Sequence, residues 1–387
     1  MDEGLRPYAT AKQLQLLDCI AANGGHIKKG IAQYGCTERV GRDMLARLRK
    51  AAAKQGWSPE HGMTRPVPEG FHVKGTSTYY DEDGNIRGQW VKSQVDREHL
   101  ETVLESLIEG ALGRVQGKAK KTKAPKTDTK RQIACYQIGD AHLGMRAYHR
   151  ETGENHDLAI GEADLRGAFK YLVDAAPKSE TALIAQFGDF FHMDDDTAQT
   201  PTNHHRLDVD GRTSKVVDVG IDTLRFGIEL ALQKHKKVIV ECAPGNHDPK
   251  LTLMLRKVML AYFSKEPRVE IVLDERPTWY MPFGKCLVGI THGHAPRPEK
   301  ALKSMAVRAK DHWHLPYKYL WHGHIHNKTM WEDMGVLVES FRTLASTDKW
   351  HTEQGYYSGR EMQCTILDAE YGEVARNTCG INLARAA

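Results

Sequence analysis

Five short clusters of aspartate, asparagine and histidine stand out in the second half of the sequence. They read GDAHLG (139–144), GDFFHMDD (188–195), GNHD (245–248), THGH (291–294) and HGHIHN (322–327). Carboxylate, amide and imidazole groups are all ligands for divalent metal ions. Two such ions about 3.5–4 Å apart need a bridging carboxylate, mixed nitrogen and oxygen ligands, and open positions for water and substrate. The five clusters supply this set, so the sequence predicts a centre for two divalent ions.

An apolar run precedes each cluster and is expected to position it. The runs are QIACYQI, ALIAQF, KVIVECA, KCLVGI and YLW, which are typical of buried strands, and later MGVLVESF and REMQCTILDAEYGEVAR also predict strands. Helical stretches lie between the runs, as in an α/β layered fold. Loops beyond the carboxyl ends of such strands converge on one crevice. Aspartate and histidine residues that only cap turns would explain one cluster, but not five at strand ends.

The order of the motifs DxH, GD, GNHD, HG and GHxH resembles the calcineurin-like metallophosphoesterase superfamily over roughly residues 132–345. The resemblance implies a four-layer α/β/β/α sandwich and two metal ions, with Mn²⁺ expected and Fe²⁺ or Zn²⁺ compatible with the ligands. It implies these metal ligands: Asp140, His142 and His326 for the first ion, Asn246, His292 and His324 for the second, and Asp189 bridging both.

The same resemblance implies roles for neighbouring residues. His247 would be the general acid or transition-state stabiliser, and Asp248 would orient it. GDFFHMDD and GNHD depart from the GDxxDRG and GNHE of phosphoprotein phosphatases, and GDFFH resembles double-strand-break repair exonucleases, in which the histidine matching His192 contributes to phosphodiester cleavage. A structural histidine near the metal is the alternative. His294 and His322 are expected to support the ligands without binding metal.

Between the second and third clusters, DDDTAQTPTNHHRLDVDGRTSKVVDVG is predicted to be an insertion beside the site. Arg206 or Arg212 could bind a substrate phosphate there. The acidic residues 194–196 would repel DNA unless they bind another cation. His235, next to Lys236, is expected at the surface.

Residues 1–56 show three helical stretches with apolar spacing, at 11–23, 26–35 and 37–56, and resemble a helix-turn-helix unit. Thr37 can cap the third stretch. This stretch offers basic residues for DNA contacts, among them Arg39, Arg42 and Arg47. A helical domain used only for packing or assembly is the alternative.

Residues 57–116 contain a hairpin signal, GTSTYY and IRGQWVK around DEDGN. Its aromatic residues, Tyr79, Tyr80 and Trp90, are interpreted as the core of a small sheet, with base stacking as the alternative. The apolar stripe of residues 96–116 predicts a helix that either dimerises or docks. Residues 117–131, with seven basic residues and one acid, are predicted to be a flexible linker before the domain of residues 132–387.

Charge is distributed unevenly along the 387 residues. The net charge is +4 overall, made of +7 in residues 1–131 (23 Lys and Arg, 16 Asp and Glu) and −3 in residues 132–387 (31 and 34). A basic half can bind nucleic acid, because neutralising phosphates supplies most sequence-independent affinity, and a solvated basic surface is the alternative. The seven cysteines are scattered without a CxxC pair, which predicts reduced thiols. No signal peptide or membrane span is expected, so the protein is predicted to be cytoplasmic, without a membrane partner.

Three functions remain open from the sequence. The preferred one is a hydrolase that cleaves DNA, holding it by the basic half. The second is a phosphodiesterase or phosphatase acting on nucleotides or other small phosphoesters, favoured by the −3 charge of the catalytic half. The third is a catalytically silent DNA-binding scaffold, against which the intact ligand set argues. The arrangement of the domains resembles proteins of tailed bacteriophages and prophages, which would place it in a bacterial host cytoplasm.

Overall fold

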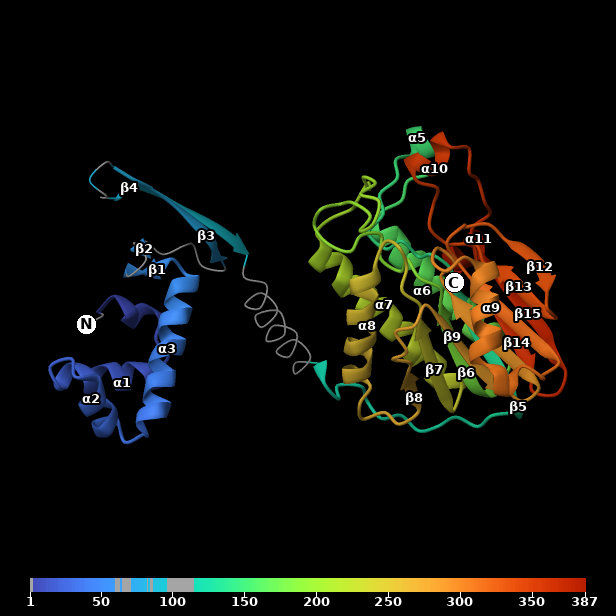
Figure 1. The fold of residues 1–387 in the computed structure, drawn as a ribbon. Helices are drawn as coiled ribbons and strands as arrows, with labels where there is room; N and C mark the ends of the chain where they lie inside the picture. Colours follow the sequence, from blue (N-terminus) through green and yellow to red (C-terminus); the bar gives the residue numbers. More distant parts are fainter. Residues whose placement is uncertain (1–2, 60–62, 65–70, 82, 84–85, 96–114) are drawn as a thin grey trace. The chain divides into compact units, whose positions relative to one another are not determined.

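The structure is a computed structural model that describes residues 3–59, 63–64, 71–81, 83, 86–95 and 115–387 (Figure 1). The chain forms two compact units, Met1–Gly110 and Ala111–Ala387, and each is considered by itself. The helix predicted for residues 96–116 lies outside the described residues except for the last two positions. Its proposed role in dimerisation therefore stays a prediction.

The first unit begins with helices. These are the 3-10 helix η1 (Glu3–Tyr8), α1 (Ala11–Ala22), α2 (Ile27–Tyr34) and α3 (Glu38–Lys54). The predicted cap is present, because the Thr37 hydroxyl accepts a hydrogen bond from the Val40 amide at the start of α3. Leu16, Ile31 and Leu45 are buried in the core that joins the three α-helices. The apolar spacing thus predicted three helices that the structure contains.

Four strands follow in the first unit: β1 (Trp57–Ser58), β2 (Met63–Thr64), β3 (Phe71–Tyr80) and β4 (Ile86–Val95). β3 and β4 form an antiparallel two-stranded sheet, the predicted hairpin. Tyr79 and Trp90 are 57% and 64% exposed, so their interpretation as a core was wrong. A two-stranded sheet is too small to bury aromatic residues on both faces. The side chain of Tyr80 lies outside the described part.

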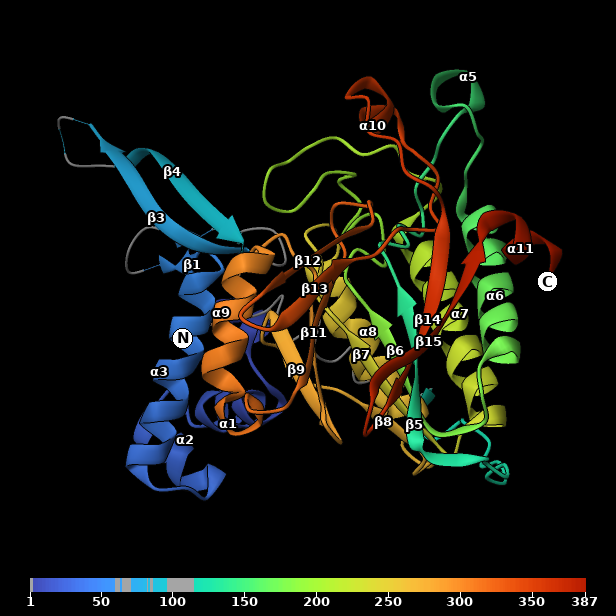
Figure 2. The same cartoon turned by 90° about the vertical axis from the view of Figure 1, so that its right-hand side faces the viewer.

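The second unit contains two mixed sheets (Figures 1 and 2). The six-stranded sheet has the order β15-β14-β5-β6-β7-β8, and β5 to β8 run parallel. Its strands are β5 (Thr129–Ile138), β6 (Ser179–Gln186), β7 (Lys237–Cys242), β8 (Val269–Ile271), β14 (Glu361–Asp368) and β15 (Gly372–Gly380).

The five-stranded sheet has the order β12-β13-β11-β10-β9, in which β10, β11 and β13 run parallel and the two edge strands antiparallel. Its strands are β9 (Thr278–Phe283), β10 (Cys286–Thr291), β11 (Tyr317–His322), β12 (Thr329–Asp333) and β13 (Val336–Ser340). Both sheets are therefore built around parallel central strands.

Helices cover the outer faces of the two sheets. The long ones are α6 (Leu158–Ala175), α7 (Thr213–Lys234), α8 (Pro249–Tyr262) and α9 (Pro298–Arg308), and the short ones are α5 (His149–Thr152), η3 (Lys310–His312), α10 (Lys349–Glu353) and α11 (Ile381–Ala386). Residues of α6, α7 and α8 share one core with the six-stranded sheet, and residues of α9 share another with the five-stranded sheet. A third core lies between the sheets and contains Leu183, Phe187 and Trp321. Three cores of this kind separate four layers, helices, sheet, sheet and helices, which is the predicted α/β/β/α order.

The burial of β6 explains why the predicted strands are continuous runs of apolar residues. Ala182 and Ile184 belong to the core beneath the helices, whereas Leu183 and Ala185 belong to the core between the sheets. A strand buried on both faces needs apolar side chains at every position. The end of such a strand is then the first place where polar side chains can lie.

The basic segment 117–131, predicted to be a flexible linker, is part of the second unit. The Gly117 amide donates to the Ala261 carbonyl, and the Thr122 amide donates to Glu266 at 3.2 Å. Ala119 is buried, and β5 already begins at Thr129. Residues of this segment therefore pack near the end of α8 despite their basic composition.

A buried ion pair holds the end of β7, just before the GNHD cluster. Arg256 on α8 lies 3.2 Å from the Glu241 carboxylate and also donates to the carbonyls of Cys242 and Asp274. Burial raises the pKa of Glu241 to about 8, although Arg256 opposes the rise. Glu241 is therefore more easily protonated in the folded chain than in the unfolded chain.

This shift predicts a pH dependence of stability. With the folded pKa about 8 and the unfolded value near 4.5, the contribution is fully present below pH 4.5 and is lost as pH rises toward 8. The side chain introduced by Glu241→Gln cannot ionise. We therefore expect the free energy of unfolding to fall less steeply with rising pH in this variant than in the wild type, and the two slopes to differ by up to about 1.4 kcal/mol per pH unit. Urea unfolding of both proteins between pH 5 and 8 measures this. Identical pH profiles would contradict it.

None of the helices in the described ranges combines the length and the apolar composition needed to cross a membrane. All seven cysteines are unpaired, and five of them are buried, as the scattered spacing predicted.

Candidate metal centre

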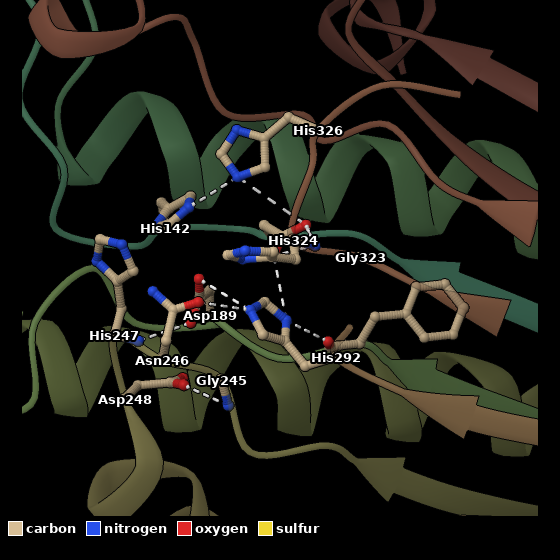
Figure 3. Close-up of polar contacts among 12 residues, drawn as sticks. His142, Asp189, Gly245, Asn246, His247, Asp248, His292, Gly323, His324 and His326 are labelled. Carbon is tan, nitrogen blue, oxygen red and sulfur yellow. Dashed lines mark hydrogen bonds and ion pairs between the residues drawn. The ribbon is translucent and has the colours of Figure 1, made fainter. Parts of the chain in front are cut away.

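The predicted ligands lie together at the ends of five strands (Figure 3). Asp140 and His142 follow β5, Asp189 follows β6, Asn246 follows β7, His292 follows β10, and His324 and His326 follow β11. Asp140, His142 and His326 offer ligand atoms within 4.8 Å of one another, and Asp189, His292 and His324 do the same. These two groups contain six of the seven predicted ligands, and a third group consists of His142, His192 and His247.

Strained backbone positions mark the same place. Seven described non-glycine residues have positive φ, and four of these are predicted ligands: His142, Asp189, His324 and His326. Residues with side chains bulkier than glycine rarely adopt this conformation, which persists only where surrounding structure enforces it. The fold therefore holds these four side chains toward the centre at a cost in backbone energy.

The first half of the centre contains two imidazoles and a carboxylate. His142 Nε2 lies 3.1 Å from His326 Nε2, and His326 Nε2 lies 4.0 Å from Asp140 Oδ2. The His324 amide donates to both oxygens of Asp140, at 3.0 and 2.9 Å, and fixes the orientation of this carboxylate. Two nitrogens and one oxygen thus face a common point.

The second half is organised by the tautomer of His292. Its Nδ1 donates to the Phe187 carbonyl at 2.7 Å, so in the neutral ring Nε2 carries a lone pair. This Nε2 lies 2.9 Å from Asn246 Oδ1 and 3.3 Å from Asp189 Oδ2. A lone pair facing two oxygen acceptors is unfavourable unless a cation or a proton lies among them. These three groups are suited to bind a divalent cation, as the sequence predicted.

Burial and charge favour cations at both positions. Asp140 and Asp189 are buried, and their ion-pair partners among the described residues are histidines. Burial raises the pKa of Asp140 to about 7. Burial lowers the pKa of His324 to about 4 and that of His326 to about 3, which keeps these rings neutral. His292 differs: burial favours its neutral form, but Asp189 and Asp140 beside it raise its pKa to about 9, so a bound cation would have to take the place of its extra proton. The neutral imidazoles of His324 and His326 fit a metal-ligand set, because metal binding needs deprotonated ligands.

His247 lies beside the centre without belonging to either ligand set. Its Nδ1 donates to the His192 carbonyl at 2.9 Å, and its amide donates to Asp189 at 2.8 Å. The Nε2 atom is left for other partners, and His247 lines the pocket at the centre. The imidazole of His192 stacks on that of His247 and contacts His142, Nδ1 to Nδ1, at 3.2 Å. His192 is therefore in contact with the predicted ligand His142 and with His247.

Asp248 was expected to orient His247, but its hydrogen bonds in the described part go elsewhere. Its carboxylate accepts from the amides of Phe191 and Gly245 and from the Thr252 hydroxyl. The ring of His247 is held by the His192 carbonyl instead. Asp248 is fully buried and ties together the GDFFH and GNHD loops, a structural role that the motif alone did not reveal.

The predicted insertion contributes to the lining of a pocket of ≈ 580 Å³, together with five of the seven predicted ligands: His142, Asp189, Asn246, His324 and His326. Arg206 lines this pocket, whereas Arg212 is the residue before α7 and lies outside the lining. Asp194 accepts hydrogen bonds from the amides of Lys250 and Leu251, the first turn of α8, and is thus engaged in the fold. The expected repulsion of DNA by residues 194–196 stays a prediction.

The structure also shows where three further histidines lie relative to the centre. The ring of His294 lies 5.0 Å from that of His292 and 6.0 Å from that of His324, beside the ligands as expected. His322 is buried at the end of β11. His235 was expected at the surface, which is wrong: it is fully buried between Tyr136 and Ser179, with which it forms hydrogen bonds.

The position of His351 and Asp348 beside the metal centre was not predicted from the sequence. His351 stacks on His326 with ring centroids 4.9 Å apart, and Asp348 lies 2.7 Å from His351 Nδ1. The spacing D-x-x-H at the start of a helix was the available signal, because an N-capping aspartate lies close to the residue three positions later.

Gly245 packs so closely on the centre that a side chain does not fit. An added Cβ would lie 1.9 Å from Asp189 Oδ1 and 2.2 Å from the Asp189 amide. We expect Gly245→Ala to displace Asp189 and to lower metal affinity at least about tenfold. Isothermal titration of Mn²⁺ measures this. The control is Gly88→Ala, which adds a Cβ in open space and should not change the metal affinity. Gly153→Ala is less suitable as a control, because Gly153 has positive φ. Wild-type metal affinity in Gly245→Ala would contradict the expectation.

In the first unit, Arg39, Arg42 and Arg47 lie on α3 and are exposed. Arg42 pairs with Glu38 at 2.8 Å. These side chains are accessible to a phosphate, and their proposed contact with DNA stays a prediction.

No protein-family model and no curated protein matches the sequence. Among solved structures, a dimetal phosphatase from Danio rerio is 10% identical with a TM-score of 0.34, over 64% of this chain and 99% of that one. An archaeal phosphodiesterase is 16% identical with a TM-score of 0.32, over 64% and 99%. A predicted phosphoesterase from Streptococcus pneumoniae is 8% identical with a TM-score of 0.27, over 64% and 98%. At these values, similarity defines neither the family nor the substrate of this chain.

Proposed function

We propose that this chain is a dinuclear-metal-dependent phosphodiester hydrolase of the calcineurin-like type and that its substrate is DNA. One observation carries the first part of the proposal. Side chains that follow five strands far apart in sequence form two groups of metal-ligand type, and five of the seven predicted ligands line one pocket together with His247, which also groups with His142 and His192. Aspartate and histidine residues that only cap turns would not need to come together from distant loops.

The residues divide the chemistry between them. Two divalent ions, when bound, supply a hydroxide near neutral pH and neutralise charge on the phosphoryl oxygens. Asp189 belongs to the second ligand group and also accepts the His247 amide, which fixes that histidine relative to the ligands. His247 holds its Nδ1 proton on the His192 carbonyl and presents Nε2 to the pocket. The protonated Nε2 can then donate to the leaving oxygen.

DNA as substrate is supported by charge and by exposed basic residues. Residues 1–131 carry a net charge of +7, and α3 presents Arg39, Arg42 and Arg47 to solvent. Phosphate contacts of this kind supply sequence-independent affinity for DNA. The GDFFH segment resembles the repair exonucleases, and His192 in that segment contacts both His142 and His247.

The test is Mn²⁺-dependent cleavage of labelled single- and double-stranded DNA beside bis-p-nitrophenyl phosphate. The wild type is compared with His247→Ala and with a variant in which Arg39, Arg42 and Arg47 are all glutamine. We expect His247→Ala to lose both activities and the arginine variant to raise KM for DNA alone. Hydrolysis of only the small diester, unchanged in the arginine variant, would overturn the DNA proposal.

A small phosphoester is the second candidate, favoured by the net charge of −3 on residues 132–387. Two bound ions would add positive charge locally, so this charge does not exclude a nucleotide or a DNA strand at the centre. A catalytically silent scaffold is the third. Turnover of any phosphodiester that is lost in His247→Ala would rule the scaffold out.

A further inference from the structure

One wall of the pocket at the metal centre is aromatic. Trp350, Tyr356 and Tyr357 line it, and the same pocket is lined by five of the predicted metal ligands and by His247. These three side chains are 54%, 55% and 65% exposed. Large aromatic rings are normally buried in a core or at an interface, because their burial removes much apolar surface from water. Three of them within eight residues, beside a polar centre, are therefore available to a planar ligand.

The aromatic wall, defined as Trp350, Tyr356 and Tyr357, is connected to the metal centre by ring contacts. The His351 ring stacks on the predicted ligand His326 at 17°, and the Trp350 ring lies 4.9 Å from that of His351. Tyr356 lies 5.8 Å from Trp350, ring to ring. The wall is thus held at the edge of the first ligand group.

The helix that carries Trp350 is anchored on both sides. Asp348 accepts hydrogen bonds from the amide and from Nδ1 of His351 and caps α10. Lys349 pairs with Glu151 of α5 at 3.2 Å, and Figure 1 shows α5 close to α10. Because these contacts fix α10, the aromatic wall is a preformed surface next to the site of hydrolysis.

The same pocket is also lined by polar side chains, among them Thr200, Asn203 and Arg206. A ligand that fits this pocket has a flat aromatic part for the aromatic rings, hydrogen-bonding edges for the polar side chains, and a phosphoester for the centre. A nucleotide residue has all three parts. Stacking on aromatic side chains tolerates any base, because every base has a π-face.

We propose that the aromatic wall is a nucleobase subsite, in which a base stacks while its phosphoester lies at the metal centre. The inference rests on the proposed function for the position of the phosphoester and adds the class of substrate, an unpaired nucleotide residue. A base inside a duplex has both faces covered by its neighbours, so the subsite selects single strands and frayed ends.

The test compares two ligands that differ only in the base, thymidine 5′-phosphate and 2-deoxyribose 5-phosphate. Their affinities for the Mn²⁺-loaded full chain are measured by titration calorimetry. We expect the wild type to bind the nucleotide about 5- to 100-fold more tightly, the range that one stacked base supplies. Trp350→Ala should bring the ratio close to one, and Trp350→Phe should retain most of it.

Tyr371→Ala is the matched control, because Tyr371 is 59% exposed and lies outside the pocket lining. Its affinity ratio should equal that of the wild type. Equal affinities of the wild type for the two ligands, or an unchanged ratio in both Trp350→Ala and Tyr357→Ala, would overturn the subsite.

A second measurement separates this inference from the proposed function. Labelled oligothymidylate is compared with a strand of abasic residues of equal length as a substrate for cleavage. Faster cleavage of oligothymidylate in the wild type, lost in Trp350→Ala, supports both proposals. A preference for thymidine 5′-phosphate without cleavage of either strand retains the subsite and overturns the DNA nuclease in favour of a mononucleotide substrate.

Discussion

Asp189→Asn is expected to remove phosphodiester hydrolysis almost completely and to release metal. The Asp189 carboxylate lies 3.3 Å from His292 Nε2 and is the predicted bridge between the two ions. An amide has the same shape but no charge, so it can still accept the His247 amide while binding metal weakly. With several kcal/mol of charge stabilisation lost, turnover of bis-p-nitrophenyl phosphate should fall roughly 10³-fold or more. Elemental analysis should find fewer than two ions per chain.

The control for this substitution is Asp311→Asn on the exposed helix η3, which changes charge by the same amount away from the centre. It should retain wild-type turnover and metal content. A full complement of two ions in Asp189→Asn, with activity within a factor of a few of the wild type, would show that Asp189 does not bridge the ions.

His247→Ala is expected to separate metal binding from catalysis. The His247 ring contributes no atom to either predicted ligand set, and its Nδ1 is engaged by the His192 carbonyl. Its loss should therefore spare both ions. Because a positioned general acid typically contributes 10²–10⁴-fold, kcat should fall by about that factor. Steady-state kinetics and metal analysis on the same preparation measure the two quantities together.

His314→Ala is the matched control, since His314 is an exposed histidine between η3 and β11. This substitution should change neither kcat nor metal content. If metal content falls in parallel with kcat in His247→Ala, His247 binds metal. The close grouping of His142, His192 and His247 makes this outcome a real alternative. In that case the proton donor to the leaving group must be sought elsewhere in the pocket.

The ligand set could be predicted from the sequence because of how parallel strands are built. Strands such as β6 are buried on both faces, so their residues are continuously apolar and the polar clusters after them stand out. Since the carboxyl ends of parallel strands lie at one edge of a sheet, residues as distant as Asp140 and His326 could be assigned to one site. The structure places His326 Nε2 4.0 Å from Asp140 Oδ2.

Contacts between loops could not be predicted in this way. GNHD predicted a histidine with an orienting aspartate, yet the carbonyl of His192 holds His247, while Asp248 joins two loops. A backbone carbonyl leaves no trace in the sequence. His235 is a comparable case, because only the packing of β5 against the end of α7 brings Tyr136 to it.

By itself, the sequence determined the strands, the helices of the first half and the chemical types of the predicted ligands, since periodicity and strand-end clusters are local properties. Only the tertiary structure decided what the other side chains do. It placed Trp350 and His351, about 25 positions beyond His326, against the metal centre, and it placed Arg206 in the pocket but Arg212 outside it. These outcomes depend on how loops from different strands pack at one sheet edge, and no local pattern encodes that packing.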